Sequence, residues 1–125
     1  MKDSIASPGL SAIIFCSASF CKLCAKIDVD YKRWAREGTK LNDSVVYGKI
    51  GGKGKAKSLL KELGITVVPS FIMFVDGARI DVTLQTGNRK IIKQCIDCIR
   101  LGDVEGVMRV VDELETQEHE TQEQV

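Results

Sequence analysis

Apolar residues follow two different spacings in the first third of the chain. Residues 11–16 form a short, nearly unbroken apolar run, which predicts a buried strand. From Phe20 onward the apolar positions recur every three or four residues, as on one face of a helix. They are Cys24, Ile27, Tyr31, Trp34 and Ala35. Gly38 is the expected end of this helix, so a helix starts here directly after a strand.

The next segment repeats the order of a strand and a helix. Residues 44–50 are rich in β-branched and aromatic side chains and predict a second buried strand. A glycine-rich loop leads from it into a second helical pattern. The apolar positions on the inner face of that helix are Ala56, Leu59, Leu60 and Leu63. Gly64 is suited to the left-handed conformation that ends a helix.

A tight hairpin is the next predicted feature. Residues 65–69 lead into a β-rich run at 70–75, which Asp76 and Gly77 close. An Asp-Gly pair between two strand-like runs is a strong signal for a two-residue hairpin turn. We therefore expect residues 79–84 to pair antiparallel with residues 70–75.

Two amphipathic helices are predicted in the last third, over residues 90–101 and 104–114. The apolar positions are Ile92, Cys95, Ile96 and Ile99 in the first, and Val104, Val107, Met108, Val111 and Leu114 in the second. Residues 115–125 have no apolar periodicity and are expected to form a disordered acidic tail.

The predicted order is β-α-β-α-β-β-α-α, which describes a mixed α/β domain. It combines a parallel strand pair, an antiparallel hairpin and helices on both faces of the sheet. The domain covers residues 1–102, followed by the extra helix at 103–114 and the tail at 115–125. A chain of 125 residues, 44% of them hydrophobic, is long enough for one such domain, and a second is not expected.

The charge distribution and the apolar runs exclude two classes of partner. The net charge is +1, but residues 112–125 carry six acidic side chains and no Lys or Arg, which leaves +7 on the rest of the chain. No aromatic residues alternate with the lysines, so no nucleic-acid partner is expected. The apolar runs at 10–16 and 65–75 are too short to span a bilayer, so no membrane partner is expected either.

Cysteine is the main chemical signal in the sequence. The five cysteines are Cys16, Cys21, Cys24, Cys95 and Cys98. An odd number, in a chain long enough to fold without crosslinks, argues against a secreted disulfide framework. It favours an intracellular reducing compartment: the cytoplasm or, if a targeting segment has been removed, an organelle such as the chloroplast. Paired cysteines in such compartments are usually catalytic or bind metal.

The pair Cys21 and Cys24 lies where a helix is expected to start. Unpaired N–H groups and the positive end of the helix dipole favour a thiolate there. Lys22 and Lys26 add positive potential, so Cys21 is expected to be the more acidic thiol and the nucleophile. Cys24, one turn further and on the apolar face, is expected to be more buried and to resolve the mixed disulfide.

Three segments resemble the thioredoxin family. The segment IIFCSASFCKLC is similar to the thioredoxin active-site segment, in which a hydrophobic strand, a small-residue turn and an aromatic precede W-C-G-P-C. The segment GITVVPSFIMFVDGARI resembles the later helix stop, proline, strand and hairpin, and QTGN matches the glycine loop before the last helix. The resemblance covers about residues 10–100. It implies a thioredoxin-like fold and a thiol–disulfide oxidoreductase that acts on proteins.

The resemblance also implies a binding surface around the cysteines. The Val68–Pro69 bond would be cis and lie beside Cys21, and the backbone of Val68 would pair with an extended substrate segment. Phe20 would form an aromatic rim, and Gly87 would leave room for a partner. The redox group would be the Cys21–Cys24 disulfide, with no cofactor and no metal. The partners would be protein disulfides and an upstream thiol reductant, and the chain a monomer that serves electron transport and redox homeostasis.

The chain departs from the family pattern at four places. Phe20 replaces the usual Trp, and Lys22-Leu23 replaces Gly-Pro between the cysteines, where sequence strongly affects the redox potential. Phe15 occupies the position of the buried Asp that accepts the proton of the resolving thiol. We therefore expect slower resolution than in an ordinary thioredoxin. Val29 stands where the family has a kinking proline, which predicts a straighter helix.

Two other functions stay open at this point. A non-catalytic binding module on the same fold is favoured by the missing Asp and by the helix at 103–114. A metal-binding protein is suggested by a second C-x-x-C pair, Cys95 and Cys98. That pair lies in mid-helix, and Cys95 is on the apolar face, so packing is the preferred interpretation, as it is for Cys16.

Overall fold

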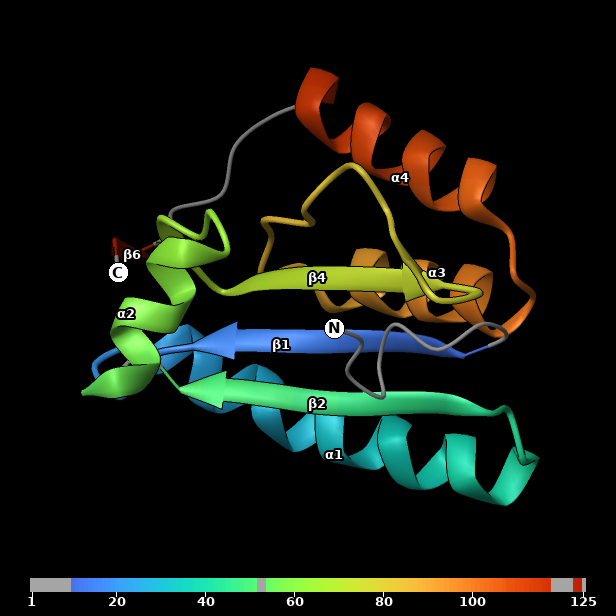
Figure 1. The fold of residues 1–125 in the computed structure, drawn as a ribbon, viewed down its shortest axis with the longest axis horizontal. Coiled ribbons are helices and arrows are strands. Elements are labelled where there is room, and N and C mark those ends of the chain that lie inside the picture. The colour runs from blue at the N-terminus through green and yellow to red at the C-terminus, as the bar shows by residue number, and fades with distance from the viewer. Residues whose placement is uncertain (1–9, 52–53, 118–122, 125) are drawn as a thin grey trace.

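The fold is built around a four-stranded mixed sheet with the strand order β2-β1-β4-β5 (Figure 1). We analysed a computed structural model that describes residues 10–51, 54–117 and 123–124. The strands of this sheet are β1 (Ser11–Ser17), β2 (Val45–Gly51), β4 (Ser70–Val75) and β5 (Ala78–Arg79). Strand β1 pairs with β2 in parallel and with β4 in antiparallel orientation, so the predicted α/β fold class is confirmed.

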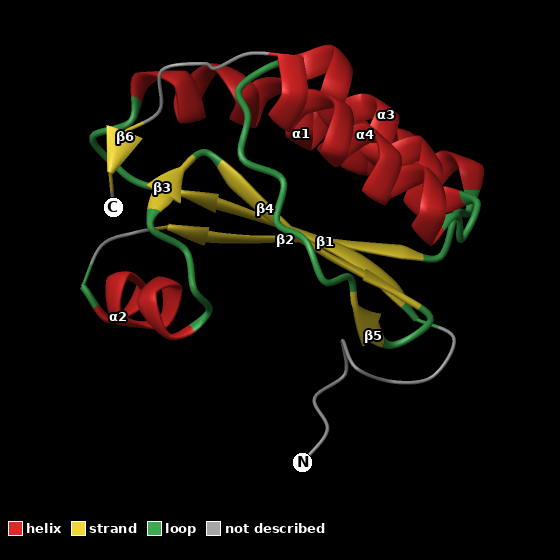
Figure 2. Cartoon of the chain, turned by 90° about the horizontal axis from the view of Figure 1, so that it is seen from above, coloured by secondary structure: helices red, strands yellow, loops and turns green. Residues whose placement is uncertain are grey.

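Helices cover both faces of the sheet. They are α1 (Lys22–Leu41), α2 (Lys55–Glu62), α3 (Arg89–Arg100) and α4 (Val104–Gln117). Helices α1, α3 and α4 lie on one face and α2 lies on the other (Figure 2). Two short strands, β3 (Val67–Val68) and β6 (Glu123–Gln124), form a separate antiparallel pair.

The central strand β1 is buried on both faces. Because side chains alternate along a strand, Ile13 and Phe15 enter the larger apolar cluster with residues of α1, α3 and α4. Ile14 and Cys16 point the other way and pack with Leu60 of α2. The strand that leads into the cysteine pair is therefore part of both cores.

The first helix does not end at Gly38, as the sequence predicted. It runs to Leu41, and Asn42 at φ 56° provides the left-handed C-cap. Gly38 is instead buried inside the helix, where a Cβ would lie 2.8 Å from the Tyr47 hydroxyl and still closer to Asp43. The glycine is needed here to leave room for the side chains of Asp43 and Tyr47 and not for a turn.

The hairpin is confirmed, but its second strand is shorter than predicted. Asp76 and Gly77 both have positive φ, at 53° and 84°, as a tight turn of this kind requires. Strand β5 ends at Arg79, which pairs with Phe74. Leu84, five residues further on, forms a bridge with Phe71, only three residues back from Phe74. Two residues therefore bulge out of the ladder and interrupt the strand.

The second helix buries less than its pattern predicted. Within α2 only Leu60 is buried, whereas Leu59 is 42% exposed. The helix has eight residues and is the only described helix on its face of the sheet (Figure 2). In such a short helix a single residue reaches the core, so the continuous apolar face that the sequence predicted is not buried.

The C-terminal segment also differs from the prediction. Helix α4 continues three residues beyond Leu114 to Gln117, because Glu and Gln are good helix formers even without an apolar face. Glu123 and Gln124 form β6 through the backbone, which needs no apolar side chains. The rest of the predicted tail, residues 118–122 and 125, lies outside the described residues.

Arg100, the last residue of α3, connects this helix to α1 and to the loop before β2. Its guanidinium donates to Asp43 Oδ2 at 2.9 Å, to Glu37 Oε1 at 3.0 Å and to the Trp34 carbonyl at 3.1 Å. The Tyr47 hydroxyl donates to Asp43 Oδ2 at 2.7 Å. The side chains of Arg100 and Asp43 are only 11% and 8% exposed, so this ion pair is largely buried.

Candidate active site

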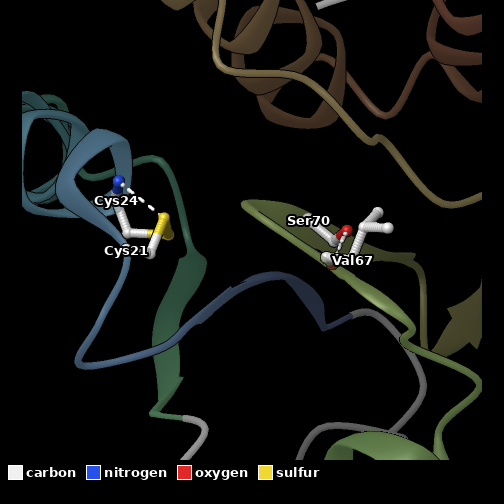
Figure 3. The surroundings of a disulfide bond; sticks show 4 residues. All are labelled: Cys21, Cys24, Val67 and Ser70. Carbon is white, nitrogen blue, oxygen red and sulfur yellow. Dashed lines mark hydrogen bonds between the residues drawn. A yellow bond between two sulfur atoms is a disulfide. The ribbon is translucent and has the colours of Figure 1, made fainter. Parts of the chain in front are cut away.

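The Cys21–Cys24 pair lies at the start of α1 and forms a disulfide with a Cα–Cα distance of 5.2 Å (Figure 3). Cys21 is the N-cap residue, with extended backbone angles, and its sulfur accepts a hydrogen bond from the Cys24 N–H at 3.1 Å. This bond satisfies one of the N–H groups that a helix start leaves unpaired. The helix start therefore supplies a polar contact directly to Cys21 Sγ.

The two cysteines are equally buried, contrary to the prediction that Cys24 would be the more buried one. Cys21 is 2% exposed and Cys24 is 3% exposed. The reason is the N-cap geometry, because the Cys21 side chain folds back over the first turn of the helix instead of pointing to solvent. Phe20, by contrast, is 50% exposed beside them.

The segment around Pro69 lies next to the cysteine pair. Cys16, near the end of β1, pairs with Ser70 at the start of β4, which brings residues 67–69 beside the connection from β1 to α1. Val68 belongs to the same apolar cluster as Cys21 and Cys24. The Val68–Pro69 peptide bond is cis, as the resemblance implied.

Ser70 is a residue at this site that the sequence did not single out. Its buried hydroxyl donates to the Val67 carbonyl at 2.7 Å, across the proline (Figure 3). A Ser directly after the proline, at the start of an apolar strand, was the signal that could have indicated it. The hydrogen bond links β3 to the first residue of β4 across the cis proline.

Gly87 lies against Leu23, one of the two residues between the cysteines. A Cβ at Gly87 would meet the Leu23 side chain, with Cγ at 2.9 Å and Cδ1 at 3.2 Å. Leu23 is partly buried and packs against the larger apolar cluster. The space that the resemblance reserves for a partner at Gly87 is thus partly filled by Leu23 of the C-K-L-C motif.

Replacing Gly87 with alanine is expected to destabilise the fold by about 1–3 kcal/mol, because the added methyl group overpacks against Leu23. A second replacement, Leu23→Ala, is expected to recover most of this loss, since it removes the clashing side chain. Urea unfolding of the two single variants and the double variant measures this coupling. The control is Gly51→Ala, where a Cβ would meet no other described atom within 4 Å. Additive effects of Gly87→Ala and Leu23→Ala would contradict the contact.

Phe15 fills the position where the family carries a buried Asp. Its ring is fully buried, stacks on Phe71 at 5.0 Å and lies 5.2 Å from Tyr31. The ammonium group of Lys49 lies 5.8 Å from the ring centroid and forms an ion pair with Asp28 at 3.1 Å. The aromatic packing around Phe15 thus replaces a base by an apolar contact.

Asp28 is the carboxylate that the helix places on the Cys24 side, since it follows Cys24 by four residues. Partial burial favours its neutral form, but hydrogen bonds and charge from Lys49 and Lys32 outweigh burial and lower the pKa of Asp28. A carboxylate with a lowered pKa is a weak base at neutral pH. Asp28 is therefore a poor substitute for the missing proton acceptor.

The other three cysteines are chemically less reactive. Burial raises the pKa of Cys16 and of Cys95 to about 12. Burial, with Asp103 and Asp97 nearby, also raises the pKa of the half-buried Cys98. The thiolate is the nucleophile, so these thiols react slowly at neutral pH. Within the described ranges, no group of three His, Cys, Asp or Glu side chains could hold a metal ion.

Comparison with known proteins identifies the fold. No protein-family model and no curated protein matches the chain. Among solved structures, the thioredoxin of Plasmodium falciparum is 26% identical, with a TM-score of 0.62, over 76% of this chain and 87% of that one. Thioredoxin f from spinach chloroplast, short form, is 21% identical, with a TM-score of 0.61, over 78% of this chain and 79% of that one.

A third match comes from the structure of the complex of ferredoxin:thioredoxin reductase with thioredoxin f2. It has a TM-score of 0.64 and 22% identity, over 76% of this chain and 81% of that one. Helices α1 to α4, in their described parts, include none that is long and apolar enough to cross a membrane. These TM-scores show that the chain shares the overall fold of the matched thioredoxins. By its fold, the chain is therefore a thioredoxin-like protein.

Proposed function

We propose that the protein is a thiol–disulfide oxidoreductase that exchanges disulfides with protein substrates through Cys21 and Cys24. The observation that carries the proposal is the Cys21–Cys24 disulfide at the N-terminus of α1, beside the cis Val68–Pro69 bond. The thioredoxin-like fold together with a disulfide-forming cysteine pair supports a redox enzyme in general.

The first step is attack of the Cys21 thiolate on one sulfur of a substrate disulfide. A Cys21–substrate S–S bond forms, the substrate S–S bond breaks, and the released substrate thiolate takes up a proton. The Cys24 thiolate then attacks Cys21 Sγ, which breaks the mixed disulfide and releases the second substrate thiol. Two electrons pass to the substrate, and the protein is left with the Cys21–Cys24 disulfide.

The helix start favours Cys21 for the first step. The Cys24 N–H that points at Cys21 Sγ over 3.1 Å stabilises a negative charge on that sulfur. Lys22 and Lys26 lie in the first turns of α1 and are exposed, so they add positive potential without burying a charge. Phe15 provides no base for Cys24, so the second step is proposed to limit the rate.

The disulfide itself serves as the redox group in this proposal, with no cofactor or metal, and the protein acts as a monomer. An upstream thiol reductant restores the dithiol. A reductase of the kind found in the thioredoxin f2 complex is one candidate class for it. The odd number of cysteines supports a reducing compartment, the cytoplasm or an organelle such as the chloroplast.

A non-catalytic binding module is the second candidate function. The observation in its favour is the apolar surroundings of the pair, with Phe15 in place of a base and Cys21 only 2% exposed. In that case the β3 edge would bind extended segments and the disulfide would be structural. The two functions differ in whether Cys21 forms a covalent intermediate.

Trapping of a mixed disulfide separates them. In Cys24→Ser, Cys21 can attack a disulfide substrate such as insulin but nothing resolves the product, so we expect a covalent complex with one substrate chain. Mass spectrometry under non-reducing conditions detects this complex, and dithiothreitol releases it. Cys21→Ser is the matched control and is expected to form none. Equal trapping by both variants, or none by Cys24→Ser, would support the binding module instead.

A further inference from the structure

The edge of β3 is occupied by the chain's own C-terminal segment. Strand β6 pairs antiparallel with β3, with Val67 opposite Gln124 and Val68 opposite Glu123. Strand β3 is not part of the four-stranded sheet, and among the described residues its strand partner is β6. Figure 2 shows the two short strands side by side.

This edge lies at the end of the molecule that carries the disulfide. Figure 1 places β6 at the end of the sheet where β1 finishes and α1 starts. Val68, opposite Glu123, packs in one cluster with Cys21 and Cys24 and directly precedes the cis proline. Any extended segment that pairs with β3 to bring its own disulfide to Cys21 must use the backbone groups that β6 now uses.

The pairing of β3 with β6 is short, so it can be displaced. Each strand has only two residues, and isolated pairs of this length are marginally stable. A covalent link compensates for the weak contact. Strand β6 starts six residues after the end of α4, and a short link of this kind gives an effective concentration in the millimolar range. We therefore expect β6 to occupy the edge of β3 when no substrate is present. A longer or better-paired segment can displace it.

We propose that residues 123–124 act as an internal competitor that occupies the substrate-strand position on β3. A disulfide-bearing protein must displace β6 before its own extended segment can pair with Val67 and Val68. The docking of β6 is independent of catalysis, whereas its effect on substrates rests on the proposed function. The competitor acts through backbone pairing, so its effect depends on the backbone N–H groups of Glu123 and Gln124 and not on the chemistry of their side chains.

Proline tests this pairing in the full-length chain. The double variant Glu123→Pro/Gln124→Pro removes both N–H groups of β6, and Glu123→Ala/Gln124→Ala is the matched control that keeps them. We expect the amide of Val67 or Val68 that faces β6 to exchange with solvent at least about tenfold faster in the proline variant. The alanine variant is expected to exchange like the wild type. Unchanged exchange in the proline variant would overturn the proposal.

Insulin reduction tests the consequence. We expect the proline variant to have kcat/KM raised by about fivefold through a lower KM, with kcat unchanged. The reason is that β6 no longer has to leave the edge of β3 before a substrate binds there. The alanine variant is expected to match the wild type. Faster exchange with an unchanged KM would show that β6 docks without competing and would overturn the proposal.

A binding assay keeps the inference separate from catalysis. A fluorescent peptide with the sequence of residues 118–125 is expected to bind the proline variant about fivefold more tightly than the wild type, because the edge is free. If the proline variant binds the peptide more tightly but the wild type shows no insulin reduction, the internal strand would be supported and the proposed function rejected. Equal binding to both proteins would overturn the internal strand whether or not the protein is a reductase.

Discussion

Replacement of Cys21 by serine is expected to lower the rate of insulin reduction by at least about a thousandfold, because it removes the nucleophile itself. A serine hydroxyl is not ionised at neutral pH and cannot form a mixed disulfide. Neither remaining feature of the site, the helix N-terminus or the β3 edge, replaces the missing sulfur. Turnover with dithiothreitol as reductant, corrected for the reaction of dithiothreitol alone, measures the loss.

The matched control is Cys98→Ser, in the last turn of α3. Cys98 is half-buried, and burial raises its pKa, so it contributes little thiolate at neutral pH. We expect this variant to keep the wild-type rate within about twofold. An equal loss in Cys98→Ser, or full activity in Cys21→Ser, would place the chemistry at another cysteine.

The second large effect is expected on stability. Arg100→Met should lower the free energy of unfolding by about 3–5 kcal/mol, because it leaves Asp43 buried without its cation. The same change breaks the hydrogen bonds to Glu37 and to the Trp34 carbonyl. Since domains of this size are stable by about 5–15 kcal/mol, a large part of the native stability is involved. Urea unfolding followed by circular dichroism measures the difference.

Arg36→Met is the control, because Arg36 is exposed on the same helix as Trp34 and Glu37. We expect a change within about 0.5 kcal/mol for it. If Arg100→Met were no more destabilising than Arg36→Met, the network at the end of α3 would not contribute to stability.

The hydrogen bonds around Asp43 also predict how the free energy of unfolding depends on pH. Burial alone would raise the pKa of Asp43, but hydrogen bonds from Tyr47, Val45 and Arg100 outweigh it and lower the pKa. A carboxyl group with a lowered pKa in the folded state stabilises the fold above its unfolded pKa, about 3.9, and this contribution is lost as the pH falls through the folded pKa. The wild type should therefore lose stability below about pH 4, and Arg100→Met should lose less over the same range.

The parts of the structure that the sequence predicted correctly are those in which one local pattern determines the outcome. Residues 11–16 alternate between two cores, yet their continuous apolar character was enough to indicate a buried strand before the cysteines. The Asp76-Gly77 turn could be predicted because few residues adopt two successive positive φ angles. The cysteine pair was placed at a helix start because the three- and four-residue apolar spacing begins at Phe20, directly after the strand.

The parts that were wrong depend on contacts between distant segments. Gly38 resembles a helix stop until Asp43 and Tyr47 are seen to pack against it. The burial of Cys21 depends on its own side-chain rotation at the N-cap. Strand β6 pairs through backbone N–H and C=O groups, and every residue carries both except proline, which lacks the N–H, so no side-chain pattern could have indicated it.

The position of β1 has a consequence for how mutations will act on the site. This strand has hydrogen-bonded neighbours on both edges and apolar layers on both faces, and the cysteine pair follows its last residue by only a short turn. Such strands open only when the whole domain unfolds, whereas short helices and two-residue strands open by local fluctuations. Variation in α2 or β6 can therefore change which partners have access while the disulfide keeps its place. A destabilising core mutation, in turn, should reduce activity in proportion to the unfolded fraction, with the surviving molecules fully competent.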